Sequence, residues 1–392
     1  EPEMAGTPAA VGALLDAVWA PAVDRCARDA DAIQALMQAD GLNDAVRPWD
    51  WRYYAERRRR QEHDVDEAEV KPYFALPAVQ AAAFDTAARL FGLSFRPIDV
   101  PLYHPEAQAF EVTRDGRHLA VFISDYLARP SKRSGAWCAS LRRQRRLGAD
   151  ERAIVVNVCN FARPEGDRPA LLSWDAARTL FHEFGHALHH ILSDVRHPSV
   201  SGTSVARDFV ELPSQLFEHW LEAPEVLDNH ARHVETGAPI PADLRERVLQ
   251  ARMLDTGFET VEYLASAFID LELHRGPAPD DPAERAASVM AERGLPAAIV
   301  PRHDVPHFLH AFASEGYAAG YYSYLWSEVM DADAFDAFRE AGDVFDAEVA
   351  RRLEETILSK GGAGDPAALY RAFRGRAPGI GPLLAGRGLS GG

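Results

Sequence analysis

One short pattern constrains the fold of this chain more than any other. Residues 182–186 read HEFGH, and they lie inside an apolar stretch that begins at Ser173. Ser173 can cap the N-terminus of a helix, and Asp175 suits the first helical turn. Because residues i and i+4 of a helix point to the same side, His182 and His186 can present two imidazole nitrogens to one ion. The stretch therefore predicts a core helix with two histidines on one side.

The acid between the two histidines has a different place on that helix. Glu183 lies one residue round from His182, about 100° away, so it is a poor ligand for the same ion. It can instead reach the open fourth position of a tetrahedral Zn²⁺, where water binds. Two satisfied core histidines are the alternative reading, but unpaired imidazoles and a carboxylate in an apolar core are costly without a metal. We expect one Zn²⁺ per chain and a water activated by Glu183.

A catalytic zinc site of this type needs a third protein ligand. The next acid-rich segment, residues 207–220, offers Glu211, Glu218 and His219. Glu211 follows His186 by 25 residues (211 − 186), which is enough for a loop and a return of the chain. Position alone leaves the choice among the three open.

Composition excludes several other classes of protein. The formal charge of −17 argues against a nucleic-acid footprint, and no run approaches ~18 uninterrupted apolar residues, so we expect no membrane span. The three cysteines are far apart and lack CxxC spacing, which favours a reducing compartment over a disulfide framework. The N-terminus shows no signal-peptide pattern. We expect a cytoplasmic protein with neither nucleic acid nor membrane as its partner.

The pattern of apolar residues changes twice along the chain. Helical periodicity is followed by alternating or β-branched runs, and the chain is helical again from residue 173. The expected helices span 8–45, 52–68 and 78–92, and the expected strands span 109–113, 118–124 and 153–157. The fold class is therefore mainly α with a small β-sheet. We divide the chain into a helical segment (1–95), a small sheet region (96–165) and a helical zinc-binding region (166–392).

Three stretches together resemble one known family. They are HEFGHALH at 182–189, SGT at 201–203 and RDFVELPSQ at 207–215. This combination resembles the thimet oligopeptidase family of zinc metallopeptidases, and within it the bacterial dipeptidyl carboxypeptidases. The resemblance implies a zincin-like (gluzincin) catalytic domain of the neurolysin and thimet oligopeptidase type.

The resemblance also implies roles for the residues of these stretches. It makes His182, His186 and Glu211 the zinc ligands and Glu183 the catalytic base. Glu218 then becomes a structural or supporting acid. Asp208 either orients a ligand histidine through its other nitrogen or caps a helix.

A second stretch is rich in tyrosine. Residues 316–326 read GYAAGYYSYLW, and on an apolar background they suit plain core aromatics as well as a site. A tyrosine hydroxyl can donate to a developing oxyanion without carrying charge. The resemblance implies that Tyr317 and Tyr324 bind substrate and stabilise the transition state, and that His310 is the counterpart of a preceding family histidine. Tyr322 is assigned to packing.

The expected function is hydrolysis of short peptides, with release of dipeptides from free C-termini (peptidyl-dipeptidase action). An endo-acting oligopeptidase of the same family is the first alternative. Family members are usually longer, with a helical N-terminal half that forms the other wall of a channel, so a non-catalytic peptide-binding fragment is the second. That missing half is the expected partner besides peptide substrates. We also expect a sheet edge near 109–124 or 153–157 to pair with the substrate as an added strand.

Overall fold

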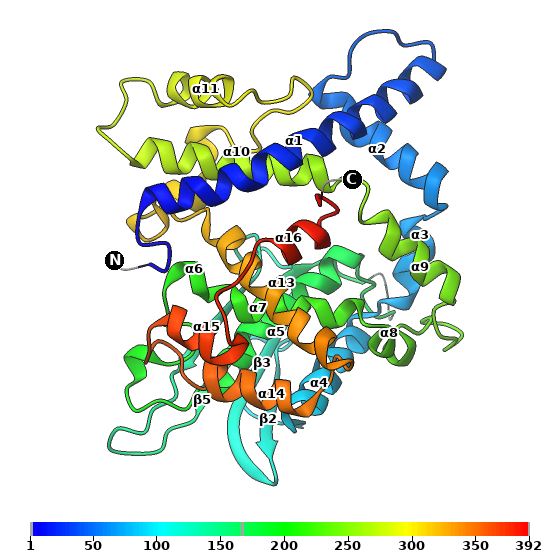
Figure 1. Cartoon of the computed structure of the whole chain (residues 1–392). Coiled ribbons are helices and arrows are strands. Elements are labelled where there is room, and N and C mark those ends of the chain that lie inside the picture. Colours follow the sequence, from blue (N-terminus) through cyan, green and yellow to red (C-terminus); the bar gives the residue numbers. More distant parts are fainter. Residues whose placement is uncertain (1–2, 165, 167, 391–392) are drawn as a thin grey trace. The chain divides into compact units, whose positions relative to one another are not determined.

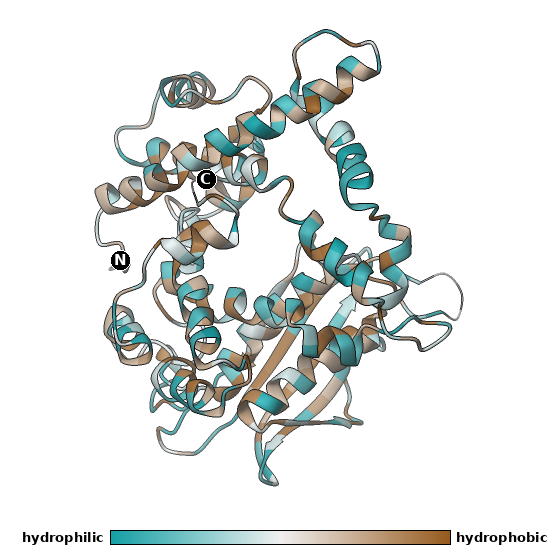
Figure 2. Ribbon diagram, turned by 45° about the vertical axis from the view of Figure 1, so that its right-hand side comes forward, coloured by the Kyte–Doolittle hydropathy of each residue, from teal (hydrophilic) through white to brown (hydrophobic). Residues whose placement is uncertain are grey.

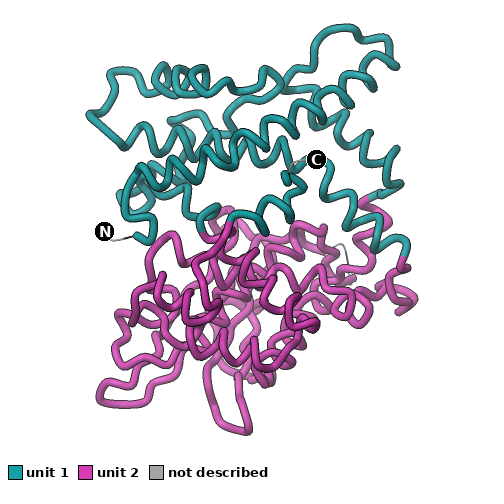
Figure 3. Tube along the Cα trace, viewed as in Figure 1, with its two compact units in different colours: residues 1–66, 243–326, 380–392 teal, residues 67–242, 327–379 magenta. Residues whose placement is uncertain are grey.

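The computed structural model describes residues 3–164, 166 and 168–390 (Figure 1). The chain is mainly helical with one small sheet, as the sequence predicts. It forms two compact units, each built from separate segments (Figure 3). Unit 1 comprises residues 1–66, 243–326 and 380–392, and unit 2 comprises 67–242 and 327–379. The division at residues 95 and 165 stays a prediction.

Unit 2 contains a five-stranded sheet with the order β1-β2-β3-β5-β4. The strands are β1 (Ser94–Ile98), β2 (Gln108–Arg114), β3 (Arg117–Leu127), β4 (Trp137–Arg142) and β5 (Ala153–Phe161). β3 and β5 are parallel, and the other neighbours are antiparallel. The three predicted strands correspond to β2, β3 and β5. The sequence analysis missed β1 and β4, which are short and at most half-buried.

The two missed strands are the edges of the sheet. β2, β3 and β5 each pair on both sides, so their backbone groups are already bonded. The prediction of a free edge near 109–124 or 153–157 is therefore wrong. The free backbone groups belong to β1 and β4.

The two faces of the sheet are covered differently. Successive side chains of a strand point to opposite faces. On one face, Phe122 of β3 packs edge-on against Phe184, with ring centroids 5.3 Å apart. Phe184 belongs to α5 (Trp174–Leu192), so this helix covers that face. On the other face, Ile123, Val156 and Val158 join a separate apolar cluster. The central strands are accordingly hydrophobic over much of their length (Figure 2).

The other regular elements of unit 2 are helices. The helix α5 begins at the predicted cap, since Ser173 Oγ accepts the backbone N–H of Ala176 at 3.1 Å. The helix α13 (Ser323–Ala341) crosses the unit boundary after Trp326. The other helices of unit 2 are α3 (Glu67–Val70), η1 (Lys71–Tyr73), α4 (Leu76–Phe91), η2 (Pro198–Val200), α6 (Arg207–Val210), α7 (Leu212–Glu218), η3 (His219–Glu222), α8 (Pro224–His230), α14 (Ala347–Leu353), η6 (Glu354–Leu358) and α15 (Pro366–Arg374).

Unit 1 is built on two long helices that lie side by side, α1 (Pro8–Ala39) and α10 (Thr256–His274) (Figure 1). A Cβ on Gly257 would lie 2.7 Å from the backbone nitrogen of Cys26, so this glycine permits their close approach. The other helices are α2 (Pro48–His63), α9 (Ala242–Ala251), α11 (Pro282–Glu292), η4 (Val305–His307), α12 (Leu309–Phe312), η5 (Glu315–Tyr317) and α16 (Gly381–Gly386). In the part of the chain that the structure describes, no helix is long and apolar enough to span a membrane.

A tight loop packs on the C-terminal half of α5. Gly202 has a φ of +57°, and its backbone N–H donates to Ser193 Oγ at 3.0 Å. A Cβ added at Gly202 would lie 2.1 Å from Nδ1 of His190. The His190 ring is buried, so it has no room to move aside. Gly202 is therefore required both for its backbone conformation and for space.

We predict that Gly202→Ala lowers the free energy of unfolding of the chain by at least about 2 kcal/mol, because the new methyl group overlaps a buried ring. Gly237→Ala is the matched control, since Gly237 also has a positive φ (+70°) but has no atom within 4 Å of the added Cβ. Its cost should be about 1 kcal/mol. Denaturant unfolding of both variants measures the difference, and equal losses would contradict the steric account.

Candidate metal centre

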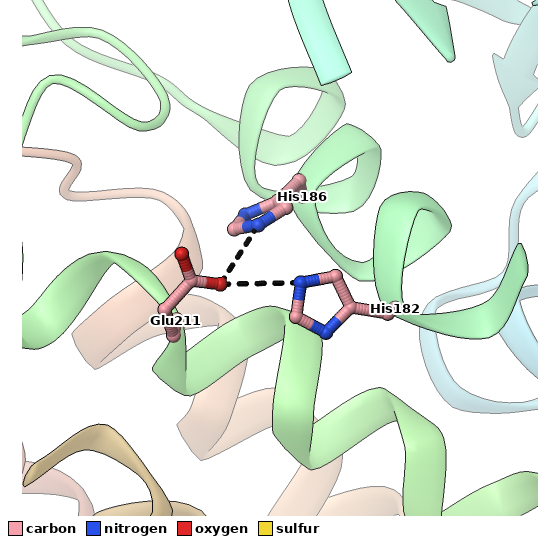
Figure 4. A group of neighbouring side chains, drawn as sticks. All are labelled: His182, His186 and Glu211. Carbon is pink, nitrogen blue, oxygen red and sulfur yellow. Dashed lines mark ion pairs between the residues drawn. The ribbon is translucent and has the colours of Figure 1, made fainter. Parts of the chain in front are cut away.

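The structure brings His182, His186 and Glu211 together (Figure 4). One ligand atom from each residue lies within 4.8 Å of the other two. Glu211 Oε2 is 3.2 Å from Nε2 of His182 and 3.0 Å from Nε2 of His186. Among the described residues, this is the one group of three or more such side chains that could hold an ion. Glu218 and His219, the rivals for the third position, are not part of it.

The approach of two helices positions the carboxylate. Glu211 stands between α6 and α7, and α7 packs against α5. A Cβ added at Gly185 would lie 2.6 Å from the carbonyl oxygen of Pro213 and 2.6 Å from Cα of Ser214. Only a glycine at this position of the HEFGH pattern leaves room for the start of α7. The small residue inside the pattern thus allows Glu211 to reach the histidines.

Neighbouring side chains fix the orientation of two of the three groups. His182 Nδ1 lies 2.6 Å from Glu218 Oε1, and a carboxylate only accepts, so Nδ1 carries the proton and Nε2 is left to face the cluster. Arg178 donates Nε–H to the other oxygen of Glu218. Ser214 Oγ lies 3.0 Å from Glu211 Oε2. Such partners orient metal ligands in many proteins.

Electrostatics favour charge separation within the cluster. Burial lowers the pKa of His182, but hydrogen bonds with Glu211 and Glu218 outweigh it and place that pKa well above its usual value. Burial raises the pKa of Glu211, but the neighbouring His186 and His182 outweigh it and place that pKa well below its usual value. Glu211 is therefore a carboxylate. Two imidazole nitrogens and one carboxylate oxygen are the ligand set of a catalytic zinc site that keeps one position open, so the residues fit that ion.

Glu183 differs from the other acids at this site. Its side chain is 5% exposed, and Oε2 has no hydrogen-bond partner among the described residues. Burial raises its pKa, although the nearby His182 and His186 lower it. A buried carboxylate oxygen without a hydrogen-bond partner is costly. One oxygen of Glu183 is thus not bonded by any of the described residues.

Two further histidines of α5 stand outside the cluster. Burial lowers the pKa of His189 to about 3 and that of His190 to about 4, so both are neutral near pH 7. His190 Nε2 lies 3.1 Å from Thr203 Oγ1. These residues are core histidines, which was the alternative reading for the motif itself.

The other predicted site residues lie in unit 1. Tyr324 Oη is 3.0 Å from Nε2 of His310, and the rings of His310 and Tyr317 have centroids 4.9 Å apart. Tyr317 is 47% exposed, whereas Tyr322 is buried beside Trp326, as expected of a packing residue. His310, Tyr317 and Tyr324 thus form one accessible group. Their catalytic roles stay predictions.

The sequence analysis missed Arg178 and Ser214. Arg178 lies one helical turn before His182 on the same face, and this spacing could have identified it.

Comparison with known proteins assigns the family of this chain. The model of Peptidase family M3 matches residues 1–389. The chain belongs to Peptidase family M3. The resemblance to oligopeptidases of the thimet type is thereby confirmed.

Curated M3 relatives are similar over nearly the whole chain. The dipeptidyl carboxypeptidase of Salmonella typhimurium is 39% identical and that of Escherichia coli 40% identical, each over 99% of this chain. Oligopeptidase A of Escherichia coli is 36% identical over 92% of it. The chain spans 58% of the length of the two carboxypeptidases and 54% of that of oligopeptidase A. A solved carboxypeptidase structure from Pyrococcus furiosus is 14% identical to this chain. The structural alignment covers 82% of this chain and 59% of the carboxypeptidase. Its TM-score of 0.47 is too low to assign the fold.

We predict that His186→Ala abolishes stoichiometric metal binding, because it removes one of the three expected ligands. The unaltered chain loaded with zinc should hold about one ion after dialysis, measured by inductively coupled plasma mass spectrometry. His197→Ala is the matched control, since His197 is an exposed histidine of the same unit outside the cluster. Full metal content in the His186 variant would show that the ligand assignment is wrong.

Proposed function

We propose that this chain is the catalytic part of a zinc metallopeptidase with a zincin-like, gluzincin-type site. His182, His186 and Glu211 hold one Zn²⁺, and Glu183 is the catalytic base. The observation that carries the proposal is the meeting of two imidazoles and one carboxylate beside a buried Glu183, whose Oε2 has no hydrogen-bond partner among the described residues. Membership of Peptidase family M3 supports it.

The chain's own residues supply the proton transfers. When bound, zinc supplies a Lewis acid that polarises a carbonyl and acidifies water. Glu183 accepts the proton of the attacking water and passes it to the leaving amine. A pKa raised by burial suits this exchange, because a base with a pKa nearer neutrality can also return the proton. Glu218 keeps His182 in the tautomer that offers Nε2.

The proposed substrates are short peptides with free C-termini, from which dipeptides are released. Two relatives of about 40% identity bear the name dipeptidyl carboxypeptidase, which supports this reading. Oligopeptidase A at 36% identity supports the endo-acting alternative.

Strand β4 is the proposed docking edge for the peptide backbone. It is an edge of the sheet, and it packs against α5, which carries the HEFGH pattern. An extended peptide can add to such an edge through main-chain hydrogen bonds, which suits substrates of mixed sequence.

Tyr317 and Tyr324 are proposed to bind substrate and donate to the oxyanion, with His310 as their neighbour. The support is their accessibility and the contact between Tyr324 Oη and His310.

The proposed partner is the N-terminal half of a longer family chain. The proposed compartment is the cytoplasm, because three free cysteines suit a reducing environment.

We predict that the zinc-loaded chain cleaves a short peptide with a free C-terminus and releases a dipeptide, detected by mass spectrometry. The same peptide with a C-terminal amide should resist cleavage, since dipeptidyl release needs the carboxylate.

We predict that Glu183→Gln retains zinc and loses turnover by a factor of about 10²–10⁴, the usual contribution of a general base.

Each alternative function has its own result in this assay. Cleavage of the amide at internal bonds would favour the endopeptidase. Peptide binding without turnover in the zinc-loaded chain would favour the non-catalytic fragment. Loss of zinc in the Glu183 variant would assign that residue to ligation or folding.

We predict that Tyr324→Phe lowers kcat by about 10²–10³-fold, as expected when one oxyanion donor is removed. KM should change little, because the hydroxyl acts once negative charge has developed. Tyr317→Phe is the companion variant, and Tyr322→Phe, which removes the hydroxyl of a buried packing residue, is the control. Steady-state kinetics measure all three, and normal kcat in both the Tyr317 and Tyr324 variants would contradict the proposed role.

A further inference from the structure

One face of α10 is polar although the helix is otherwise largely buried and apolar. The residues on this face are Tyr263, Ser266, Asp270 and His274, separated by three, four and four positions. That spacing places all four side chains on one side of a helix. Ser266 and Asp270 are 2% and 1% exposed. Because buried polar groups are costly unless they are bonded, their partners show what this face does.

Asp270 bonds the tyrosine loop, which we define as residues 313–322. Its Oδ1 accepts the backbone N–H of Ala319 at 3.0 Å, and its Oδ2 accepts the backbone N–H of Tyr321 at 2.8 Å. Both carboxylate oxygens are therefore used by the loop. His274 Nδ1 lies 3.0 Å from Oδ1 of Asp270 as well.

The other three residues of this face hold the end of the loop and the segments on either side of it. The hydroxyl of Tyr263 donates to the carbonyl oxygen of Tyr321 at 2.6 Å and accepts the N–H of Leu325 at 3.2 Å. Ser266 Oγ lies 3.2 Å from Nδ1 of His303. The ring of His274 stacks on Phe312, with centroids 5.1 Å apart. The loop is thus held at its beginning and at its end.

The backbone of the loop needs this support. Ala319 has a φ of +54°, a left-handed conformation that is unfavourable for a residue with a Cβ. Such a conformation persists only where the surroundings impose it. The Asp270 carboxylate bonds the amide of Ala319 itself. It also bonds the amide of Tyr321, which lies between the two proposed catalytic tyrosines.

We infer that Asp270 is a positioning residue that holds the tyrosine loop in the shape from which Tyr317 and Tyr324 act. The inference rests on the proposed function, because it deepens the role given there to the two tyrosines. Asp270 itself contacts backbone amides and His274, so it acts through the loop and not on substrate.

The first test measures the loop without any reaction. Asp270→Asn keeps the size of the side chain but replaces one acceptor oxygen with an NH₂ donor, so two amides compete for one acceptor. Hydrogen exchange at Ala319 and Tyr321 should rise by a factor of about 5 to 30, the equivalent of one lost hydrogen bond. Glu272→Gln is the matched control, because Glu272 lies on the same helix and pairs with Arg275 and Arg285, not with the loop.

The second test is a double-mutant cycle on turnover. If Asp270 acts through the tyrosines, Asp270→Asn should lower kcat with little change in KM, while Glu272→Gln has normal kinetics. Combining Asp270→Asn with Tyr324→Phe should then cost less than the product of the two single losses. Purely additive losses, or unchanged exchange at both amides, would overturn the inference.

Two further measurements distinguish a failure of this inference from a folding defect and from a failure of the proposed function. If Asp270→Asn does not fold, Tyr263→Phe removes one hydroxyl from the same face, and it should raise exchange at Leu325 and lower kcat in the same way. Normal exchange and kcat in that variant would overturn the inference. Turnover that survives Glu183→Gln would contradict the proposed function, whereas the exchange rates at Ala319 and Tyr321 would still decide whether Asp270 holds the loop.

Discussion

The Oε2 atom of Glu211 lies within hydrogen-bonding distance of the Nε2 atoms of both His182 and His186, and much of unit 2 serves to hold it there. The sheet supports α5 through Phe184, and Gly185 lets α7 approach α5 closely enough for Glu211 to reach the two rings. The lone pairs of three polar side chains that meet in a protein interior repel one another unless a cation or shared protons lie between them. The neighbouring bonds to Glu218 and Ser214 help to hold His182 and Glu211 in this arrangement.

Unit 1 uses the same physical means on a loop. Here the buried carboxylate of Asp270 bonds backbone amides and allows Ala319 to adopt an unfavourable conformation. The loop also carries Tyr317 and Tyr321, and Tyr324 follows it within one helical turn. A carboxylate with both oxygens occupied by amides is a rigid support, because moving the loop would leave a buried charge without partners. Each unit therefore depends on an acid that several polar partners surround.

How much the sequence could predict depends on whether the partners are close in the chain. The cap at Ser173 and the shared side of His182 and His186 follow from helix geometry alone, so they were predictable. Glu211 could be selected over Glu218 only through family resemblance, since both lie in one helical stretch. The edge strand β4 was missed because its alternation of apolar residues covers only six residues, none of which is buried. Asp270 was missed because its partners lie 49 and 51 residues away, and alanine at position 319 gives no sign of a left-handed conformation.

The most direct test of the account is X-ray absorption spectroscopy of the zinc-loaded chain, because it counts ligands by element and distance. The account predicts two imidazole nitrogens at about 2.0–2.1 Å, carboxylate oxygen at about 2.0–2.2 Å and no sulfur. Thiols are available as competitors, since Cys138 and Cys159 lie near enough to Glu183 for its charge to help raise the pKa of each, after burial itself. A sulfur shell at about 2.3 Å, or three or more imidazoles, would contradict the assignment of His182, His186 and Glu211 as the metal site.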